Sequence, residues 1–261
     1  ADAVKAALGG DPSRRGQGND LPPTYGPPPT FHTRRPTTRM GVDWVFRKAF
    51  YDAQRARAGL ELHGADRPPP GAIPVLQALL DGKAPLRIQA RMQHDIFSAL
   101  RLANEFKLKF ILEEATEAYR ALPQLKAAGV PVIFGPLYME PSGWRRFSGG
   151  ETERPRLNAP KQLADAGIDF ALTAQEMRDE DGLIRQAMLA ARFGLPADVA
   201  LCAITATPAR FLGLADQLGT LKSGAAADLV VWSAEPLAAT SKPVLILIGG
   251  RVVLDGDRVI R

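Results

Sequence analysis

Residues 85–106 read PLRIQARMQHDIFSALRLANEF, and this stretch decides the fold class of the chain. Leu86 to Ala90 is a short apolar run typical of a buried strand. Asp95 to Phe106 has helical periodicity, and Asp95 stands where a helix-capping side chain is expected. A strand followed by a helix in so few residues indicates a parallel sheet, because each crossover between parallel strands needs its own helix.

The same unit recurs three times towards the C-terminus. Glycines close the helices of these units, as expected for a residue that tolerates a left-handed backbone. Strands are predicted at residues 109–113, 130–134 and 168–172, and helices at 116–128, 158–166 and 182–193. Upstream, helices are predicted at residues 40–58 and 73–80.

The C-terminal part changes character. After a helical stretch at residues 198–211, the chain contains β-type runs separated by Gly and Pro turns, at 227–232, 244–248 and 251–254. No crossover helix remains between them, so an antiparallel appendix is predicted. The chain therefore divides into a Pro/Gly-rich arm or linker (1–39), an α/β section (40–215) and a β appendix (216–261).

The composition of the chain argues against a membrane-spanning and a nucleic-acid-binding protein. Hydrophobic residues make up 46% of the 261 residues and charged residues 23%, which is ordinary for a globular protein. No apolar run is long enough to span a bilayer. The net charge of +5 comes from Arg and Lys scattered among carboxylates, and no segment matches a nucleic-acid-binding motif. We therefore expect neither a membrane nor a nucleic-acid partner, and the cellular compartment stays open.

The stretch ITATPARFLGLADQLGTLKSGAAADLVVW (204–232), followed by VLILIGGRVVLDG (244–256), resembles the C-terminal signature of the amidohydrolase superfamily. The matching positions form a long, ordered set: Thr205, Pro208, Ala209, Leu212, Gly213, Gly219, Leu221, Gly224, Ala227, Asp228, Leu229 and Gly250. The resemblance implies a helix after the last barrel unit and a return of the chain to a small β-sandwich.

The middle of the chain resembles the imidazolonepropionase-like branch of that superfamily, over RIQARMQHDIFSALRLANEF (87–106) and ILEEATEAYRALPQLKAAGVPVIFGP (111–136). This implies a TIM-type (β/α)₈ barrel with its active site at the carboxyl ends of the strands. Only the C-terminal half of such a barrel is evident, and the HxH pair of the family's first strand has no counterpart. A complementary N-terminal half chain or a homo-oligomer is therefore the expected partner.

The positions that hold metal in the family are substituted here. The resemblance places Gln89, or Arg91 two residues later, where the fifth strand carries His. It places Glu113-Glu114 at the His of the sixth strand, and Gln175 at the Asp of the eighth. Gln and Arg are poor ligands for a catalytic cation, so no metal ligand and no cofactor are predicted. Zinc or another divalent metal is expected only if the chain is an active hydrolase.

One constellation remains for a site at the barrel mouth. Gln89, Arg91, Gln175 and the loop residue Trp144 are candidates for binding a small molecule, and Glu114 is the candidate acid or base. The alternative is a degenerate site filled by a mutually neutralising Arg–Glu pair, because buried charges are usually paired.

Isolated reactive residues carry less weight. His32, His63 and His94 lack the clustered donors that a metal needs, and Cys202 lies in an apolar helical stretch where cysteine behaves as a small hydrophobe.

Three functions follow from these observations. The first is an amidohydrolase-like binding or scaffold subunit of a larger assembly, without the metal site. The second is a metal-dependent hydrolase of C–N bonds in cyclic amides or similar small molecules, completed by an N-terminal half that supplies HxH. The third is a non-enzymatic assembly module that docks through its Pro-rich arm. Whether the chain is an enzyme is left open by the sequence.

Overall fold

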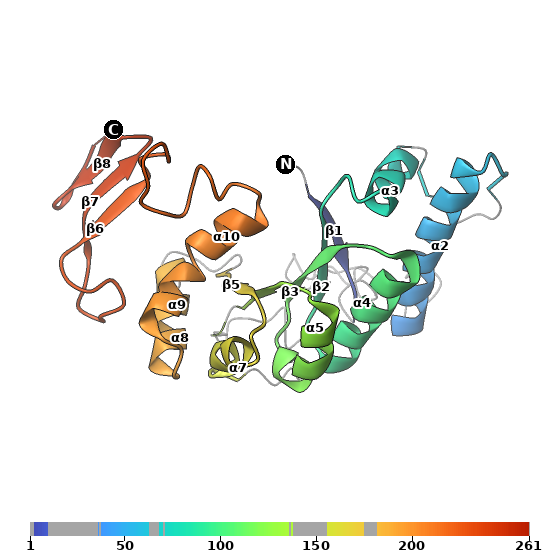
Figure 1. Cartoon of the computed structure of the whole chain (residues 1–261), viewed down its shortest axis with the longest axis horizontal. Helices are drawn as coiled ribbons and strands as arrows, with labels where there is room; N and C mark the ends of the chain where they lie inside the picture. The colour runs from blue at the N-terminus through green and yellow to red at the C-terminus, as the bar shows by residue number, and fades with distance from the viewer. Residues whose placement is uncertain are drawn as a thin grey trace, which may run out of the picture. The chain divides into compact units, whose positions relative to one another are not determined.

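The computed structural model of the chain describes residues 3–9, 36, 38–62, 68–69, 71–135, 137, 156–174 and 182–260 (Figure 1). Its parallel sheet has the strand order β1-β2-β3-β4-β5, and a separate four-stranded sheet has the order β6-β7-β8-β9. Contacts group the described residues into an N-terminal unit up to 132 and a C-terminal unit from 133, so the division falls inside β4.

The N-terminal unit is built on three parallel strands, β1 (Val4–Ala7), β2 (Leu86–Ala90) and β3 (Phe110–Glu114). Leu86 pairs with Val4 on one side and Phe110 on the other. Because side chains alternate along a strand, one face of β2 carries buried Leu86, Ile88 and Ala90, and the opposite face carries polar residues.

Helices pack beside these strands in the order α2 (Arg39–Arg57), α3 (Ala72–Leu80), α4 (Gln93–Phe106) and α5 (Leu122–Ala128), with the 3₁₀ turn η2 (Ala118–Arg120) before α5. Thr38 caps α2, and its hydroxyl accepts a hydrogen bond from the Gly41 amide at 3.1 Å. Phe50 joins α2 to α4, because its ring lies 5.0 Å from that of Phe46 and 5.2 Å from that of Phe106.

The C-terminal unit contains the last two residues of β4 (Val132–Phe134) and the strand β5 (Phe170–Leu172). It also contains four helices: α7 (Ala159–Asp165), α8 (Leu183–Arg192), α9 (Ala197–Cys202) and α10 (Ala206–Phe211). The Thr173 amide donates to the Phe134 carbonyl at 2.9 Å, next to β5. The unit ends in an antiparallel sheet of β6 (Leu229–Trp232), β7 (Pro243–Ile248), β8 (Arg251–Asp255) and β9 (Arg258–Val259).

The predicted α/β class, with a parallel sheet and a separate antiparallel sheet at the C-terminus, is confirmed. Three local predictions are wrong. Val4–Ala7, expected in the arm, forms a strand paired with β2. Residues 116–128 form a 3₁₀ turn and a shorter helix, and residues 198–211 form two helices separated at Ala203–Thr205.

The helix capping of α4 also differs from prediction. The capping position belongs to Met92, and Asp95 lies inside the first turn of α4, where its carboxylate is bound by a side chain from α2. Among the helices of the described part of the chain, none combines the length and the apolarity that crossing a bilayer requires.

Candidate functional site

The carboxyl ends of β1, β2 and β3 lie side by side in the N-terminal unit. Their register aligns Ala7 with Gln89 and Gln89 with Glu113, and Ala90 with Glu114. This edge of a parallel sheet is where α/β proteins place their ligands, because the loops after the strands converge there. It is therefore the candidate site.

Arg91 and Glu114 form an ion pair at this edge. The Arg91 guanidinium donates through Nε to the Glu114 carboxylate, and both side chains are largely removed from water. The backbone also joins the two loops, because the Glu117 amide donates to the Arg91 carbonyl at 2.9 Å. Glu114 has a left-handed backbone with φ of 66°, and Ala115 follows with φ of 48°. Such a conformation is unfavourable for non-glycine residues and needs support from its surroundings.

Glu113 points to the opposite face of β3 and is held by two cations. The Arg87 guanidinium contacts one carboxylate oxygen, and Lys5 Nζ lies 3.1 Å from the other. Lys5 and Arg87 are register partners on neighbouring strands, so their side chains share one face of the sheet. Glu113 is buried, whereas both cations keep partial contact with water.

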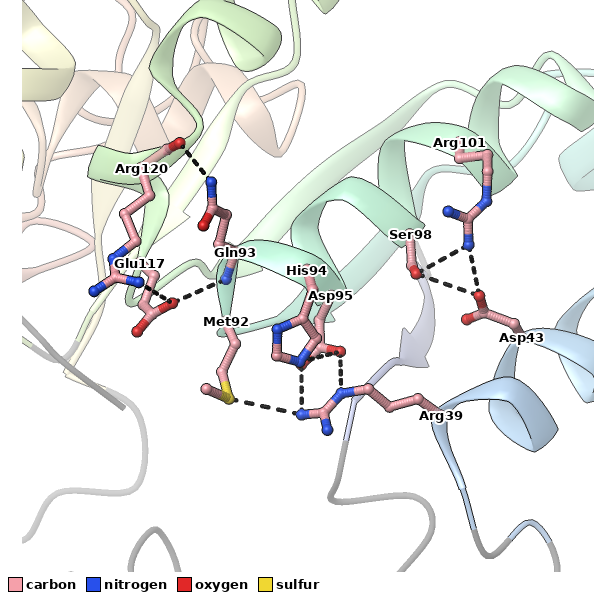
Figure 2. Close-up of polar contacts among 10 residues, drawn as sticks. All are labelled: Arg39, Asp43, Met92, Gln93, His94, Asp95, Ser98, Arg101, Glu117 and Arg120. Carbon is pink, nitrogen blue, oxygen red and sulfur yellow. Dashed lines mark hydrogen bonds and ion pairs between the residues drawn. The ribbon is translucent and has the colours of Figure 1, made fainter. Parts of the chain in front are cut away.

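A third buried carboxylate, that of Glu117, lies at the N-terminus of α4. It accepts a hydrogen bond from the Gln93 amide at 3.1 Å, and Arg120 Nη1 lies 3.9 Å from it (Figure 2). Gln93 in turn donates through Nε2 to the Arg120 carbonyl at 3.1 Å. A carboxylate at this place is favoured by the positive end of the helix dipole. The hydrogen bond that Arg120 Nε donates to the Tyr119 hydroxyl oxygen and the charge of Glu117 raise the pKa of Arg120 above its ordinary value.

Asp95, in the first turn of α4, contacts both the start of α2 and the segment that follows β1. Arg39 Nε donates to Asp95 Oδ1 at 2.7 Å, and His94 Nε2 lies 3.5 Å from the same oxygen (Figure 2). Arg39 also reaches Met92 Sδ at 3.6 Å. Gly9, with φ of 93°, approaches so closely that an added Cβ would lie 2.5 Å from Asp95 Oδ2. Asp95 is thus a structural carboxylate, and His94 stays half-exposed beside it.

The carboxylates of this edge do not fit a divalent cation. Each lies against at least one Arg or Lys, and a guanidinium both occupies the carboxylate oxygens and repels a cation. Within the described ranges, no group of three or more His, Cys, Asp and Glu side chains could hold a metal ion. These residues can take part in recognition by charge and by hydrogen bonds.

The structure brings together part of the predicted constellation. Arg91 and Glu114 are in contact, and Gln89 is the register neighbour of Glu113. Gln175 and Trp144 lie outside the described residues, as do His32 and His63. The roles assigned to all five predicted site residues remain predictions.

Sequence reasoning missed Lys5, Arg87 and Arg39 as members of the site. The available signal for Arg87 was strand alternation, since Arg87 and Gln89 lie on the same face of β2 and Glu113 is the register partner of Gln89 on β3.

Several known proteins are similar to this chain in sequence and in fold. The family described as "Amidohydrolase family" matches residues 166–254. An amidohydrolase of *Thermotoga maritima* of known structure superposes on 97% of this chain with a TM-score of 0.79 and 28% sequence identity. The chain is therefore similar to the amidohydrolase superfamily in both sequence and fold. Its five-stranded parallel sheet agrees with the predicted partial TIM-type barrel.

Two curated proteins are also similar to this chain in sequence. Amidohydrolase tasK of *Hapsidospora irregularis* is 25% identical over 248 residues, which is 87% of this chain and 24% of tasK. An imidazolonepropionase of *Mesorhizobium japonicum* is 45% identical over 53 residues, or 20% of this chain and 13% of that protein. The chain spans about a quarter of the length of tasK and 62% of the solved *Thermotoga* chain.

Proposed function

We propose that this chain is a binding or scaffold subunit built on the amidohydrolase fold, acting without a divalent metal. The ion pair between Arg91 and Glu114 carries the proposal. Glu114 stands at the strand end where the family resemblance expects a metal-binding His, and its carboxylate is already bound by a permanently cationic group.

The free-energy cost of binding a metal ion at Glu114 supports the proposal. A metal ion at Glu114 would first have to displace Arg91, and breaking a buried pair costs about 3–5 kcal/mol. Gln89 on the neighbouring strand is a weak, neutral donor, so it would return little of that free energy. Cation binding at this edge is therefore disfavoured twice, by the lost ion pair and by the missing imidazoles.

Elemental analysis tests the proposal directly. The protein is purified together with any co-purifying subunit, and zinc, iron and manganese are counted per chain. We expect far less than one metal ion per chain, and a near-stoichiometric signal would overturn the proposal. The matched variant R91H/E114H should bind zinc more tightly than the parent in competition with a fluorescent chelator, because it removes the Arg91 charge and places two imidazole donors where Arg91 and Glu114 are in contact.

A ligand-binding role has its own test. Arg91 would bind an anionic group if Glu114 were displaced, so carboxylates and cyclic amides are screened by thermal shift. A stabilising ligand whose effect is lost in R91M would support a small-molecule site. Absence of any stabilising compound would favour the scaffold role over ligand binding.

A metal-dependent hydrolase is the second candidate, favoured by the similarity to proteins named amidohydrolase and imidazolonepropionase. In this case an N-terminal half would supply the HxH pair. Hydrolysis of cyclic amides is assayed with added zinc or manganese and with any co-purifying subunit present. Metal-dependent turnover would support this candidate against the first.

Docking through the Pro-rich arm remains a third prediction, and residues 10–35 lie outside the described part. Gly9 and Arg39 both meet Asp95, so a short connector can join them after deletion of residues 11–35. The four remaining residues and their flanks reach about 17 Å when extended. An unchanged sedimentation profile of the deletion variant would exclude this role.

A further inference from the structure

The outer face of α2 carries a row of large, exposed side chains. Four residues, spaced by four, three and four positions, share this face of the helix: Met40, Trp44, Arg47 and Tyr51. Met40 is 82% exposed, Trp44 51% and Tyr51 48%, and the Arg47 side chain keeps partial contact with water. Trp, Tyr and Arg are the residues that most often contribute large binding free energies at protein interfaces, where Met is also enriched. A row of this composition indicates an interaction surface, whereas single exposed apolar residues do not.

This row lies along the line where α2 meets α4. The Arg101 guanidinium of α4 donates through Nη2 to Asp43 Oδ2 at 2.8 Å (Figure 2). Further along, Arg47 Nε donates to Glu105 Oε2 at 2.8 Å, and the Tyr51 hydroxyl donates to Glu105 Oε1 at 2.9 Å. Residue numbers rise together along these contacts, so the two helices run in the same direction. We call the surface formed by six residues the α2–α4 seam: Met40, Trp44, Arg47, Tyr51, Arg101 and Glu105.

The charges of the α2–α4 seam are complementary to those of a second, reversed copy. Arg101 and Glu105 are four residues apart on one face of α4, and their side chains are 56% and 25% exposed. A two-fold axis that crosses both helices at right angles reverses their direction in the partner copy. When this axis passes α4 midway between the two residues, each Arg101 lies opposite the partner's Glu105. Two ion pairs then form from a single symmetry operation, which is how the commonest class of homo-oligomer is built.

The same axis brings the row on α2 against its own copy. The side-chain contacts between the helices place residues 45–46 of α2 on this axis. Reversal about this point puts Trp44 opposite the partner's Arg47, and Met40 opposite the partner's Tyr51. A guanidinium over the face of an indole ring is a favourable cation–π contact, and a thioether packs well against an aromatic ring. One symmetry operation therefore gives every member of the seam a chemically suitable neighbour.

We propose that a second copy of this chain packs on the α2–α4 seam about this two-fold axis and forms a dimer. The copies overlap over about 14 residues of α2, or about 21 Å, so the interface lies at the small end of specific interfaces. A small interface implies a dimer that dissociates at micromolar concentrations. The inference does not depend on whether the ends of β1–β3 bind a metal or another ligand, so the two proposals can fail separately.

Sedimentation velocity of the purified full chain tests the dimer. We expect the sedimentation coefficient to rise from that of a monomer to that of a dimer between about 1 and about 200 μM. W44D should weaken the association at least tenfold, because it removes the cation–π contact at both ends of the interface. Trp44 is half-exposed, so the variant should fold, as judged by circular dichroism. The control L221D changes a residue that is 87% exposed and distant in sequence from both helices, and it should leave the association unchanged.

A mixing experiment tests the pairing of the charges. R101E alone and E105R alone each place like charges opposite one another in a homodimer, so each variant should associate at least tenfold more weakly than the parent. An equimolar mixture of the two variants restores opposite charges at both contacts. We therefore expect the mixture to form a heterodimer more tightly than either variant forms a homodimer.

Three results would overturn the proposal. The first is a parent chain that stays monomeric over the whole concentration range. The second is a dimer that W44D leaves intact, since another surface would then hold the copies together. The third is a mixture of R101E and E105R that associates no better than either variant alone, because the two residues would then not face each other across the axis.

Discussion

Removal of the Glu114 charge should destabilise the N-terminal unit measurably. E114Q leaves the Arg91 guanidinium beside a neutral amide in a largely buried place. Breaking a buried pair from one side costs about 3–5 kcal/mol, and because Arg91 keeps some contact with water we take the lower end, about 3 kcal/mol. At about 2–4 °C per kcal/mol for a protein of this size, Tm should fall by about 6–12 °C.

A double-mutant cycle by calorimetry and urea unfolding isolates the pair. R91M leaves the buried Glu114 carboxylate unpaired and should cost at least as much as E114Q, whereas R91M/E114Q removes both charges and should be more stable than either single variant. D216N is the matched control, because Asp216 contacts Lys222 at 3.3 Å on the surface, where such pairs contribute about 0–1 kcal/mol. A Tm change for E114Q no larger than that of D216N would refute the view that this pair is a supporting element of the site.

Three further changes have defined outcomes. Lys107 ends α4 with φ of 56°, so K107G should stabilise the protein by about 1 kcal/mol in urea unfolding, and a loss would contradict the left-handed geometry. G9A forces a Cβ against Asp95 on a backbone with φ of 93° and should destabilise by about 2–4 kcal/mol in the same assay, whereas an unchanged midpoint would show that the approach is loose. Burial raises the pKa of the Glu105 carboxyl, but hydrogen bonds from Arg47 and Tyr51 outweigh burial and leave this pKa below its ordinary value. A lowered folded-state pKa gives stability above the unfolded pKa that is lost as pH falls through the folded one. E105Q should thus be less stable than the parent at pH 7, and the difference in stability should disappear as the pH falls through the folded-state pKa of Glu105.

The strands and helices that follow local patterns were predictable from the sequence. Leu86–Ala90 has the predicted bounds, because a short apolar run between a proline and a polar segment leaves few alternatives. The strand Val4–Ala7 was not predicted, because the sequence VKAA has little intrinsic preference for a strand. It forms one because it pairs with β2, some eighty residues later in the chain.

The candidate site was only partly predictable, for a related reason. Arg91 and Glu114 could be placed together because each follows a recognisable strand. Glu113 is paired with Lys5 and Asp95 with Arg39. Both cations come from distant segments of the chain, so no local sequence pattern predicts these pairs. Asp95 is an example. Its position in the sequence is typical of a helix cap, but in the structure its carboxylate forms an ion pair with Arg39 from α2.

The pairing of every carboxylate at the ends of β1–β3 also sets the local electric field. Five cations, one more than the acids they contact, gather there: Lys5, Arg39, Arg87, Arg91 and Arg120 opposite Asp95, Glu113, Glu114 and Glu117. The excess positive charge gives this end of the sheet a weakly positive potential, which raises the encounter rate of anions and lowers that of cations. An anion should therefore reach this surface faster than a cation of the same size, and raising the ionic strength should reduce that difference.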